Sequence, residues 1–142
     1  MVRQKINRRV KLLEHKHIII RAEVLDPPRA ENPTSEQVKT LINDIGMKIM
    51  MGPFAQRSEM VGNAGLTVAT IIETSHVILH TWDEVHPALM QLDVYTCSHL
   101  DPKIVFKWLE QFKPTKIDYK YIDREFKLDL KRKRIPFHIE QG

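Results

Sequence analysis

The stretch from Gly65 to Cys97 concentrates side chains that can act as nucleophiles, acids or bases. Hydroxyls, imidazoles, carboxylates and a thiol alternate there with apolar residues: Thr67, Glu73, Thr74, Ser75, His76, His80, Trp82, Asp83, Glu84 and Cys97. A sheet protein has little structural reason to place so many reactive groups in one hydrophobic hairpin. The sequence therefore predicts that this stretch carries a functional site.

A metal site is the first chemistry that these residues suggest. His76 and His80 have the i, i+4 spacing that brings two imidazoles onto one ion when the segment is helical. The apolar residues 77–79 between them favour a strand instead, in which the two Cα atoms lie about 13 Å apart. The glutamate of the HExxH motif is also missing. We therefore expect no metal at this position.

Nucleophilic catalysis offers two further possibilities, and the residues alone do not decide between them. A Ser-His-Asp hydrolase would use Ser75 and His80 with Asp93 or Glu84, although the GxSxG elbow is absent. A thiol enzyme would pair Cys97 with a histidine, but no histidine is singled out as its partner. Taken singly, a cysteine or a histidine in an apolar strand is also typical of an ordinary core.

Length and composition predict one folded domain over residues 1–142. The chain is 42% hydrophobic and 28% charged, and no apolar run approaches the roughly 20 residues of a membrane span. A domain of this size folds without disulfides or a structural metal. Its single cysteine favours a reducing compartment, and the basic N-terminus lacks the apolar core of a secretion signal. We therefore expect a cytoplasmic protein that binds no membrane.

The net charge of +4 comes from the two ends of the chain. Basic residues cluster at about residues 1–11 and 127–142, whereas the middle of the chain carries much of the acidic charge. No stacking aromatic residues interleave with the basic runs, so we interpret them as solvated, flexible tails. A nucleic-acid-binding module is a minor alternative, and it predicts an affinity that falls steeply with salt.

Apolar patterns predict the order β-α-β-β-β-β-α-β. The strands are expected at His17–Val24, Lys48–Met51, Leu66–Ile72, Val77–Trp82, Leu92–Thr96 and Ile117–Ile122. The chain between the third and fourth of these strands is expected to turn near residues 73–76. Short links between consecutive strands favour an antiparallel sheet.

Two helices complete the predicted fold. The first is expected to be capped by Thr34 or Ser35 and to stop at Gly46, with an apolar stripe at Val38, Leu41, Ile42 and Ile45. The second begins at Asp101-Pro102, an N-cap followed by proline at the first helical position. Its apolar face is Ile104, Val105, Trp108, Leu109 and Phe112. The expected fold class is α+β, a two-layer sandwich with both helices on one face of a largely antiparallel sheet.

The spacing of the polar residues resembles that of the prokaryotic-type, self-processing S-adenosylmethionine decarboxylases. The shared motifs are Thr74-Ser75-His76, His80-Thr81-Trp82 with Glu84, and Asp93 to Cys97, preceded by Gly65-Leu66-Thr67 where the family has Gly-x-Ser. The resemblance extends over about residues 12–121. It implies that the Ser75 hydroxyl attacks the preceding carbonyl and that the chain is cleaved between Thr74 and Ser75. The cofactor is then a pyruvoyl group derived from Ser75.

The resemblance also implies a role for each matching residue. The pyruvoyl ketone would form a Schiff base with the substrate amine and act as an electron sink for loss of CO2. His80 would move a proton during processing, Thr67 would assist with its hydroxyl, and Cys97 would reprotonate the substrate carbon. Glu84 would accept hydrogen bonds from the ribose hydroxyls. Trp82 would face the substrate, although by itself a tryptophan in this pattern is more typical of a core.

Three positions depart from the family pattern. Thr74 stands where glutamate usually precedes the processing serine, and Ser98 stands where glycine often follows the cysteine. The segment from Ser75 to Cys97 is also a little longer than in the better-known members of the family. The resemblance implies decarboxylation of S-adenosylmethionine for spermidine biosynthesis, in a homodimer with active sites near the subunit interface. The alternatives are a decarboxylase of ornithine or arginine, and an uncleaved homologue that binds a ligand without catalysis.

Overall fold

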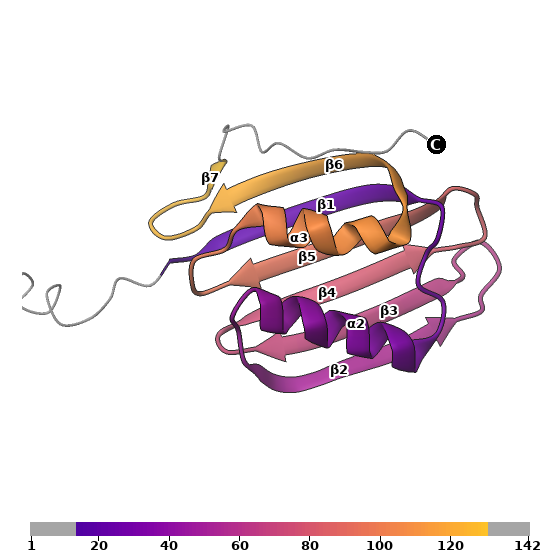
Figure 1. Ribbon diagram of the computed structural model, residues 1–142, viewed down its shortest axis with the longest axis horizontal. Helices are drawn as coiled ribbons and strands as arrows, with labels where there is room; N and C mark the ends of the chain where they lie inside the picture. Colours follow the sequence, from indigo (N-terminus) through magenta and orange to yellow (C-terminus); the bar gives the residue numbers. More distant parts are fainter. Residues whose placement is uncertain (1–13, 131–142) are drawn as a thin grey trace, which may run out of the picture.

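A seven-stranded antiparallel sheet forms the body of the protein (Figure 1). The computed structural model describes residues 14–130. Its strands are β1 (Lys16–Val24), β2 (Ile49–Ser58), β3 (Gly65–Ile72), β4 (Ser75–Trp82), β5 (Ala88–Thr96), β6 (Pro114–Asp123) and β7 (Asp129–Leu130). They lie side by side in the order β2-β3-β4-β5-β1-β6-β7, and every neighbouring pair is antiparallel. Strands β3, β4 and β5 thus form a continuous meander in the middle of the chain.

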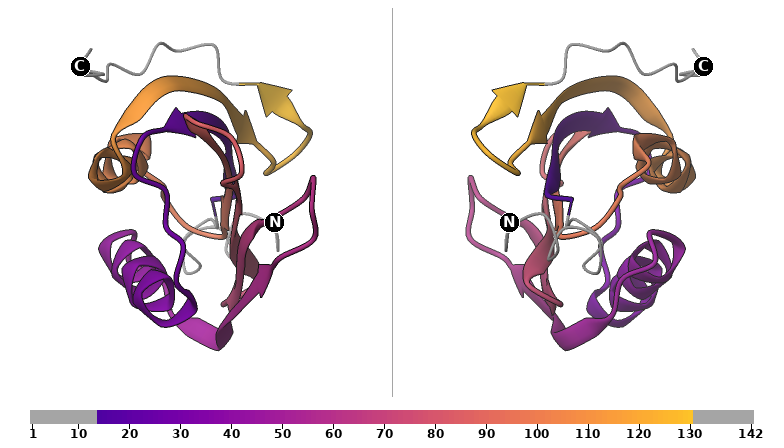
Figure 2. Two further views of the ribbon diagram at one scale, coloured as in Figure 1. Left: turned by 90° about the vertical axis from the view of Figure 1, so that its right-hand side faces the viewer. Right: turned by 90° about the vertical axis from the view of Figure 1, so that its left-hand side faces the viewer.

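Both helices pack on the same face of the curved sheet (Figure 2). They are α2 (Glu31–Asp44) and α3 (Pro102–Leu109), and α3 continues into a 3-10 turn, η1 (Glu110–Phe112). Side chains of both layers form one core, which includes Ile18, Ile20, Val38, Leu41, Leu79, Met90, Val105 and Leu109. The predicted α+β sandwich with two helices on one face is confirmed. The opposite face, here called the open face, is covered by neither helix.

The predicted cap of the first helix is wrong. The helix begins at Glu31, and Ala30 occupies the N-cap without a side-chain hydrogen bond. Pro33 therefore lies inside the first turn, where the missing N–H has no partner within the helix to lose. Thr34 does not cap the helix, because its hydroxyl donates to the carbonyl of Ala30 at 2.6 Å. Gly46 follows the helix end with a positive φ of 76°, as predicted.

The start of the second helix is confirmed. Asp101 is its N-cap, and the carboxylate accepts the N–H of Lys103 at 3.0 Å. The strand ends differ more from the prediction, because strand pairing continues beyond the apolar runs. Strand β2 runs past Gly52-Pro53 to Ser58 with shifts in register. Strand β4 begins at Ser75, two residues before the predicted Val77, and β5 begins at Ala88, four residues before the predicted Leu92. The short strand β7 was not predicted.

Two sequence expectations concern the ends of the chain and membranes. The basic clusters of the first residues and of Lys131–Arg134 lie outside the described residues. Among residues 14–130, no helix combines the length and the apolar character needed to cross a membrane.

The backbone of β3 approaches that of β4 so closely at Gly65 that no side chain fits. A Cβ atom there would lie 1.7 Å from the carbonyl oxygen of Thr81. We expect Gly65→Ala to lower the free energy of unfolding by about 3 kcal/mol, because backbone must move. Gly46→Ala is the comparison, since its Cβ meets nothing within 4 Å and only the positive φ is unfavourable, at about 1 kcal/mol. Urea unfolding measures both, and equal losses would contradict the close approach.

Candidate active site

The turn between β3 and β4 places a strained residue directly before Ser75. Ile72 pairs with Ser75, so Glu73 and Thr74 form the whole connection. Thr74 has a φ of +56°, in the left-handed region that costs a residue with a Cβ atom about 1–2 kcal/mol. Residues held in such conformations cluster at functional sites. The strain lies at the residue whose carbonyl group is bonded to the nitrogen of Ser75.

Three side chains converge on the carbonyl oxygen of Glu73. The hydroxyls of Thr74 and Ser75 donate to it at 2.8 and 3.1 Å, and the thiol of Cys97 donates at 3.1 Å. Ser75 is 8% exposed, and Cys97 lies partly exposed just beyond the end of β5. The Ser75 hydroxyl proton is directed to Glu73, so its oxygen lone pairs are left for attack. The turn thus gathers a nucleophile and a proton donor around one carbonyl.

His80 and Thr67 form a direct cross-strand pair on the open face. They are opposite each other in β4 and β3, and the Thr67 hydroxyl lies 2.8 Å from Nδ1 of His80. The Trp82 ring lies beside that of His80, with 6.1 Å between the ring centroids. Trp82 is partly exposed, and its indole N–H donates to the side-chain oxygen of Asn63 at 2.8 Å. A core position for Trp82, which the sequence pattern alone favours, is therefore wrong.

Glu84 is held by the backbone of the connection between β2 and β3. Its carboxylate accepts the N–H of Gly62 at 2.9 Å and that of Ala64 at 2.8 Å. Asn63, the partner of Trp82, lies between these two residues. The residues from 59 to 64, here called the 59–64 loop, therefore contact both residues that were predicted to bind substrate. Asn63 was missed from the sequence, because only the folded hairpins bring it to Trp82.

The predicted site residues form two groups at opposite ends of β4. The turn group is Thr74, Ser75 and Cys97; the loop group is Thr67, His80, Trp82 and Glu84. Ser75 and His80 are five residues apart in one strand, a separation of about 16 Å. An odd spacing also puts them on opposite faces, and Ser75 shares the buried face with Val77 and Leu79.

This separation corrects two expectations from the sequence. The hairpin does not bring all of its reactive groups together, because strand alternation and length keep the two groups apart. Ser75 and His80 cannot act as the nucleophile and base of a hydrolase within one chain. Cys97, in turn, donates to a backbone carbonyl rather than to a histidine.

A second polar cluster on the open face was not predicted. Nε2 of His17 lies 2.6 Å from Oδ1 of Asp93, and Nε2 of His76 lies 3.0 Å from the same atom. Burial raises the pKa of Asp93, but His17 and His76 together outweigh this effect, so the pKa lies below its ordinary value. Tyr95 packs between the two imidazoles, to which it is directly opposite in β5. The sequence alone does not reveal this cluster. Its residues come together only when β1, β4 and β5 pair in the observed order and register, which places all three side chains on one face.

The geometry of this cluster favours hydrogen bonding over metal binding. The ligand atoms of His17, His76 and Asp93 lie within 4.8 Å of one another, close enough for three ligands of one ion. However, the guanidinium of Arg124 lies 3.2 Å from Nδ1 of His17. An arginine can only donate, so Nδ1 accepts and the proton of His17 is on Nε2. That nitrogen then donates to Asp93 and has no lone pair for a metal.

Comparison with known proteins supports a common origin for most of the described chain. The family model for S-adenosylmethionine decarboxylase matches residues 16–125. An S-adenosylmethionine decarboxylase proenzyme of Pyrobaculum arsenaticum is 44% identical over 64 residues, which are 44% of this chain and 50% of that protein. An arginine decarboxylase proenzyme of Aeropyrum pernix is 40% identical over 62 residues, which are 42% of this chain and 46% of that protein. The chain thus spans about half the length of these relatives.

A solved structure supports the fold over a longer region. The crystal structure of the adenosylmethionine decarboxylase from Aquifex aeolicus covers 89% of this chain and 100% of that chain, with a TM-score of 0.60 and 20% identity. This similarity concerns the arrangement of strands and helices alone. The match of the family model extends from β1 through β6 and includes both groups of candidate residues. The chain belongs to the S-adenosylmethionine decarboxylase family.

Proposed function

We propose that the protein cleaves itself between Thr74 and Ser75 and then decarboxylates S-adenosylmethionine, supplying the aminopropyl donor for spermidine. The observation that carries this proposal is the turn group, in which Ser75 directly follows the strained Thr74 and its hydroxyl donates to the same carbonyl of Glu73 as the thiol of Cys97. Membership of the family and similarity to proenzymes support the same conclusion.

The bonds that form and break during processing belong to atoms of the turn and to one water, and the proton transfers need a base in addition. Oγ of Ser75 attacks the carbonyl carbon of Thr74, and the peptide nitrogen leaves as an amine, so an ester replaces the amide. Removal of the α-proton of Ser75 then breaks the bond between Cβ and the ester oxygen and releases the Thr74 carboxylate. The resulting enamine becomes an imine, which water converts to the pyruvoyl ketone with release of ammonia. Breaking the chain also relieves the backbone strain at Thr74.

His80 reaches this chemistry from a second copy of the chain. Within one chain it lies about 16 Å from Ser75 and on the other face of β4. The open face also exposes apolar side chains, with Ile19 41% and Ile71 45% exposed. Burying such residues is favourable and supports a homodimer. Two open faces stacked in opposite directions would bring the loop group of one chain to the end of the sheet at which the turn group of the other lies.

The turn group and the loop group have different roles toward the substrate. The pyruvoyl group, once formed at residue 75, supplies the carbonyl that takes up the electron pair left by loss of CO2. Cys97, whose thiol lies at the same turn, donates the proton that the substrate carbon then needs. Glu84 accepts hydrogen bonds from the ribose hydroxyls, and Trp82 presents its ring to the substrate.

Self-cleavage predicts two fragments in purified protein. Intact mass spectrometry should find residues 1–74 and a second fragment that begins with the pyruvoyl group. Ser75→Ala removes the attacking oxygen, so it should leave one uncleaved chain. Cys97→Ala should still cleave but release CO2 poorly, because it lacks the proton donor. A wild-type protein that stays whole would support the non-catalytic, ligand-binding alternative, and cleavage of Ser75→Ala would refute the proposed nucleophile.

The two-chain arrangement predicts that two inactive variants restore each other. In a heterodimer of Ser75→Ala and His80→Ala chains, one of the two sites contains both an intact Ser75 and an intact His80. We expect co-expression to yield cleavage of part of the His80→Ala chains, whereas neither variant cleaves when expressed alone. Mass spectrometry of differently tagged chains measures this fraction. The absence of cleaved His80→Ala chains in purified heterodimers would show that both groups act within one chain.

Substrate choice is tested by release of CO2. We expect S-adenosylmethionine to be decarboxylated, but the similarity to arginine decarboxylase proenzymes makes arginine a specific second candidate. Carboxyl-labelled S-adenosylmethionine, ornithine and arginine are compared at equal concentration. Glu84→Gln should raise KM for S-adenosylmethionine about tenfold, because a neutral amide accepts weaker hydrogen bonds than a carboxylate. Preferential release from arginine would instead assign Glu84 to a guanidinium.

A further inference from the structure

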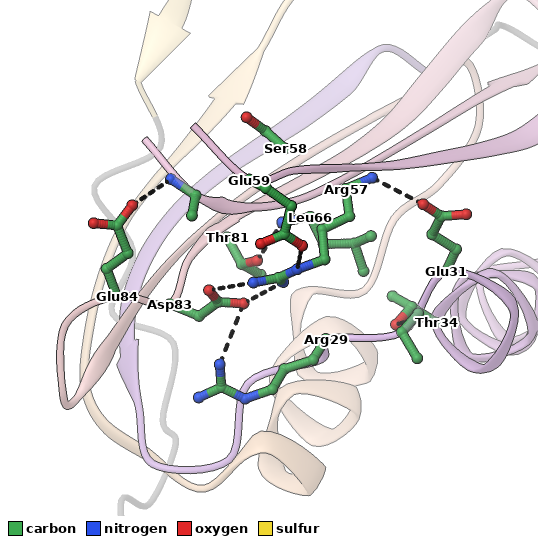
Figure 3. A network of polar contacts seen from close by, with 12 residues as sticks. Arg29, Glu31, Thr34, Arg57, Ser58, Glu59, Leu66, Thr81, Asp83 and Glu84 are labelled. Carbon is green, nitrogen blue, oxygen red and sulfur yellow. Dashed lines mark hydrogen bonds and ion pairs between the residues drawn. The ribbon is translucent and has the colours of Figure 1, made fainter. Parts of the chain in front are cut away.

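An ion pair between a partly exposed arginine and a buried aspartate lies beside the loop group. The side chain of Asp83 is 2% exposed, and its two oxygens lie 2.6 and 2.9 Å from the two terminal nitrogens of Arg57 (Figure 3). This is the bidentate geometry that fixes the relative orientation of two groups as well as their distance. Neither residue belongs to the motifs that carry the family resemblance.

The pair joins the segment that carries Trp82 and Glu84 to the strand that leads into the 59–64 loop. Asp83 lies between Trp82 and Glu84 in the chain, so its position constrains both neighbours. Arg57 is the second-last residue of β2, which leads into the 59–64 loop. The N–H of Asp83 also donates to the carbonyl of Ala64 at 3.2 Å. The ion pair therefore connects the loop to the chain segment that the loop contacts.

Further charged groups hold Arg57 in this position. Its Nε lies 2.6 Å from the Glu59 carboxylate, and its backbone N–H donates to Glu31 of α2 at 3.0 Å. Arg29 also approaches Asp83, at 3.4 Å. Arg57 holds the pKa of Asp83 below its ordinary value, against the opposing effect of burial. The resulting stabilisation is present at neutral pH and is lost as the pH falls through that lowered pKa.

From these contacts we propose that Arg57 and Asp83 are a positioning pair, which fixes the 59–64 loop and thereby orients Glu84 and Trp82 for substrate. The inference rests on the proposed function. Without the pair, the loop loses the contact that anchors its first end, and the amides of Gly62 and Ala64 hold Glu84 less firmly. Thr67 and His80, the loop-group residues that act in processing, are held opposite each other by the register of β3 and β4 and not by the 59–64 loop. The pair therefore acts on substrate binding and leaves processing unchanged.

The test uses two conservative variants that keep the size of the side chain. Arg57→Lys keeps the positive charge but loses the bidentate contact with Asp83. Asp83→Asn keeps the shape of the side chain but loses its negative charge. We expect kcat/KM for S-adenosylmethionine to fall about tenfold in each, almost entirely through KM, with unchanged self-cleavage. Amide hydrogen exchange at Gly62 and Ala64 should become about tenfold faster, because the loop opens more often.

Asp101→Ala is the matched control for a general loss of stability. It removes the N-cap of α3 and so destabilises the fold, but it touches neither the loop nor the ion pair. It should lower the melting temperature without changing KM or exchange at Gly62. Normal KM and normal exchange in Arg57→Lys and Asp83→Asn would overturn the inference. So would equal losses of cleavage, kcat and melting temperature, since those indicate a purely structural pair.

The exchange measurement also separates this inference from the proposed function. It needs no substrate and no cleavage, and it reports the loop contacts directly. A wild-type protein that neither cleaves nor releases CO2 refutes the proposed function. Unchanged exchange in the variants of an active wild-type protein refutes the positioning pair alone.

Discussion

Strand alternation along β4 is the constraint on which the candidate site depends. A strand sends successive side chains to opposite faces, so β4 contributes Val77 and Leu79 to the core and His80 and Trp82 to the open face. The same strand therefore stabilises the fold and displays polar groups. Because its register is fixed by β3 and β5 on either side, these groups cannot shift without exposing the core.

Because the strand fixes its side chains at the two ends of β4, one chain does not bring all of the candidate reactive groups together. A strand is rigid and extended, so residues at its two ends stay about 16 Å or more apart however the loops are arranged. A protein that builds its site along one strand must either use the two ends separately or combine two copies. The exposed apolar residues of the open face favour the second solution for the proposed reaction.

Local signals predicted the fold class and most of the elements. The isoleucine run of β1 and the Asp101-Pro102 start of α3 depend on neighbouring residues, and both are confirmed. Contacts between residues that are distant in the sequence could not be predicted. The start of α2 at Glu31 and the extension of β2 past Gly52-Pro53 depend on tertiary packing and on pairing with β3. The residue types of the site could likewise be predicted, whereas their division into two groups required the register of the sheet.

Neither the ion pair between Arg57 and the buried Asp83 nor the strain at Thr74 could be predicted from the sequence, for the same reason. Each is unfavourable when considered alone, since a buried charge needs a partner and a β-branched residue avoids a positive φ. Glycine or asparagine would suit the turn at residue 74 better. In the proposed reaction the strain at Thr74 exists only until the chain is cut, so it destabilises the precursor and not the product. The replacement of the family's glutamate by threonine thus removes no reacting atom, and the unfavourable backbone at residue 74 favours cleavage.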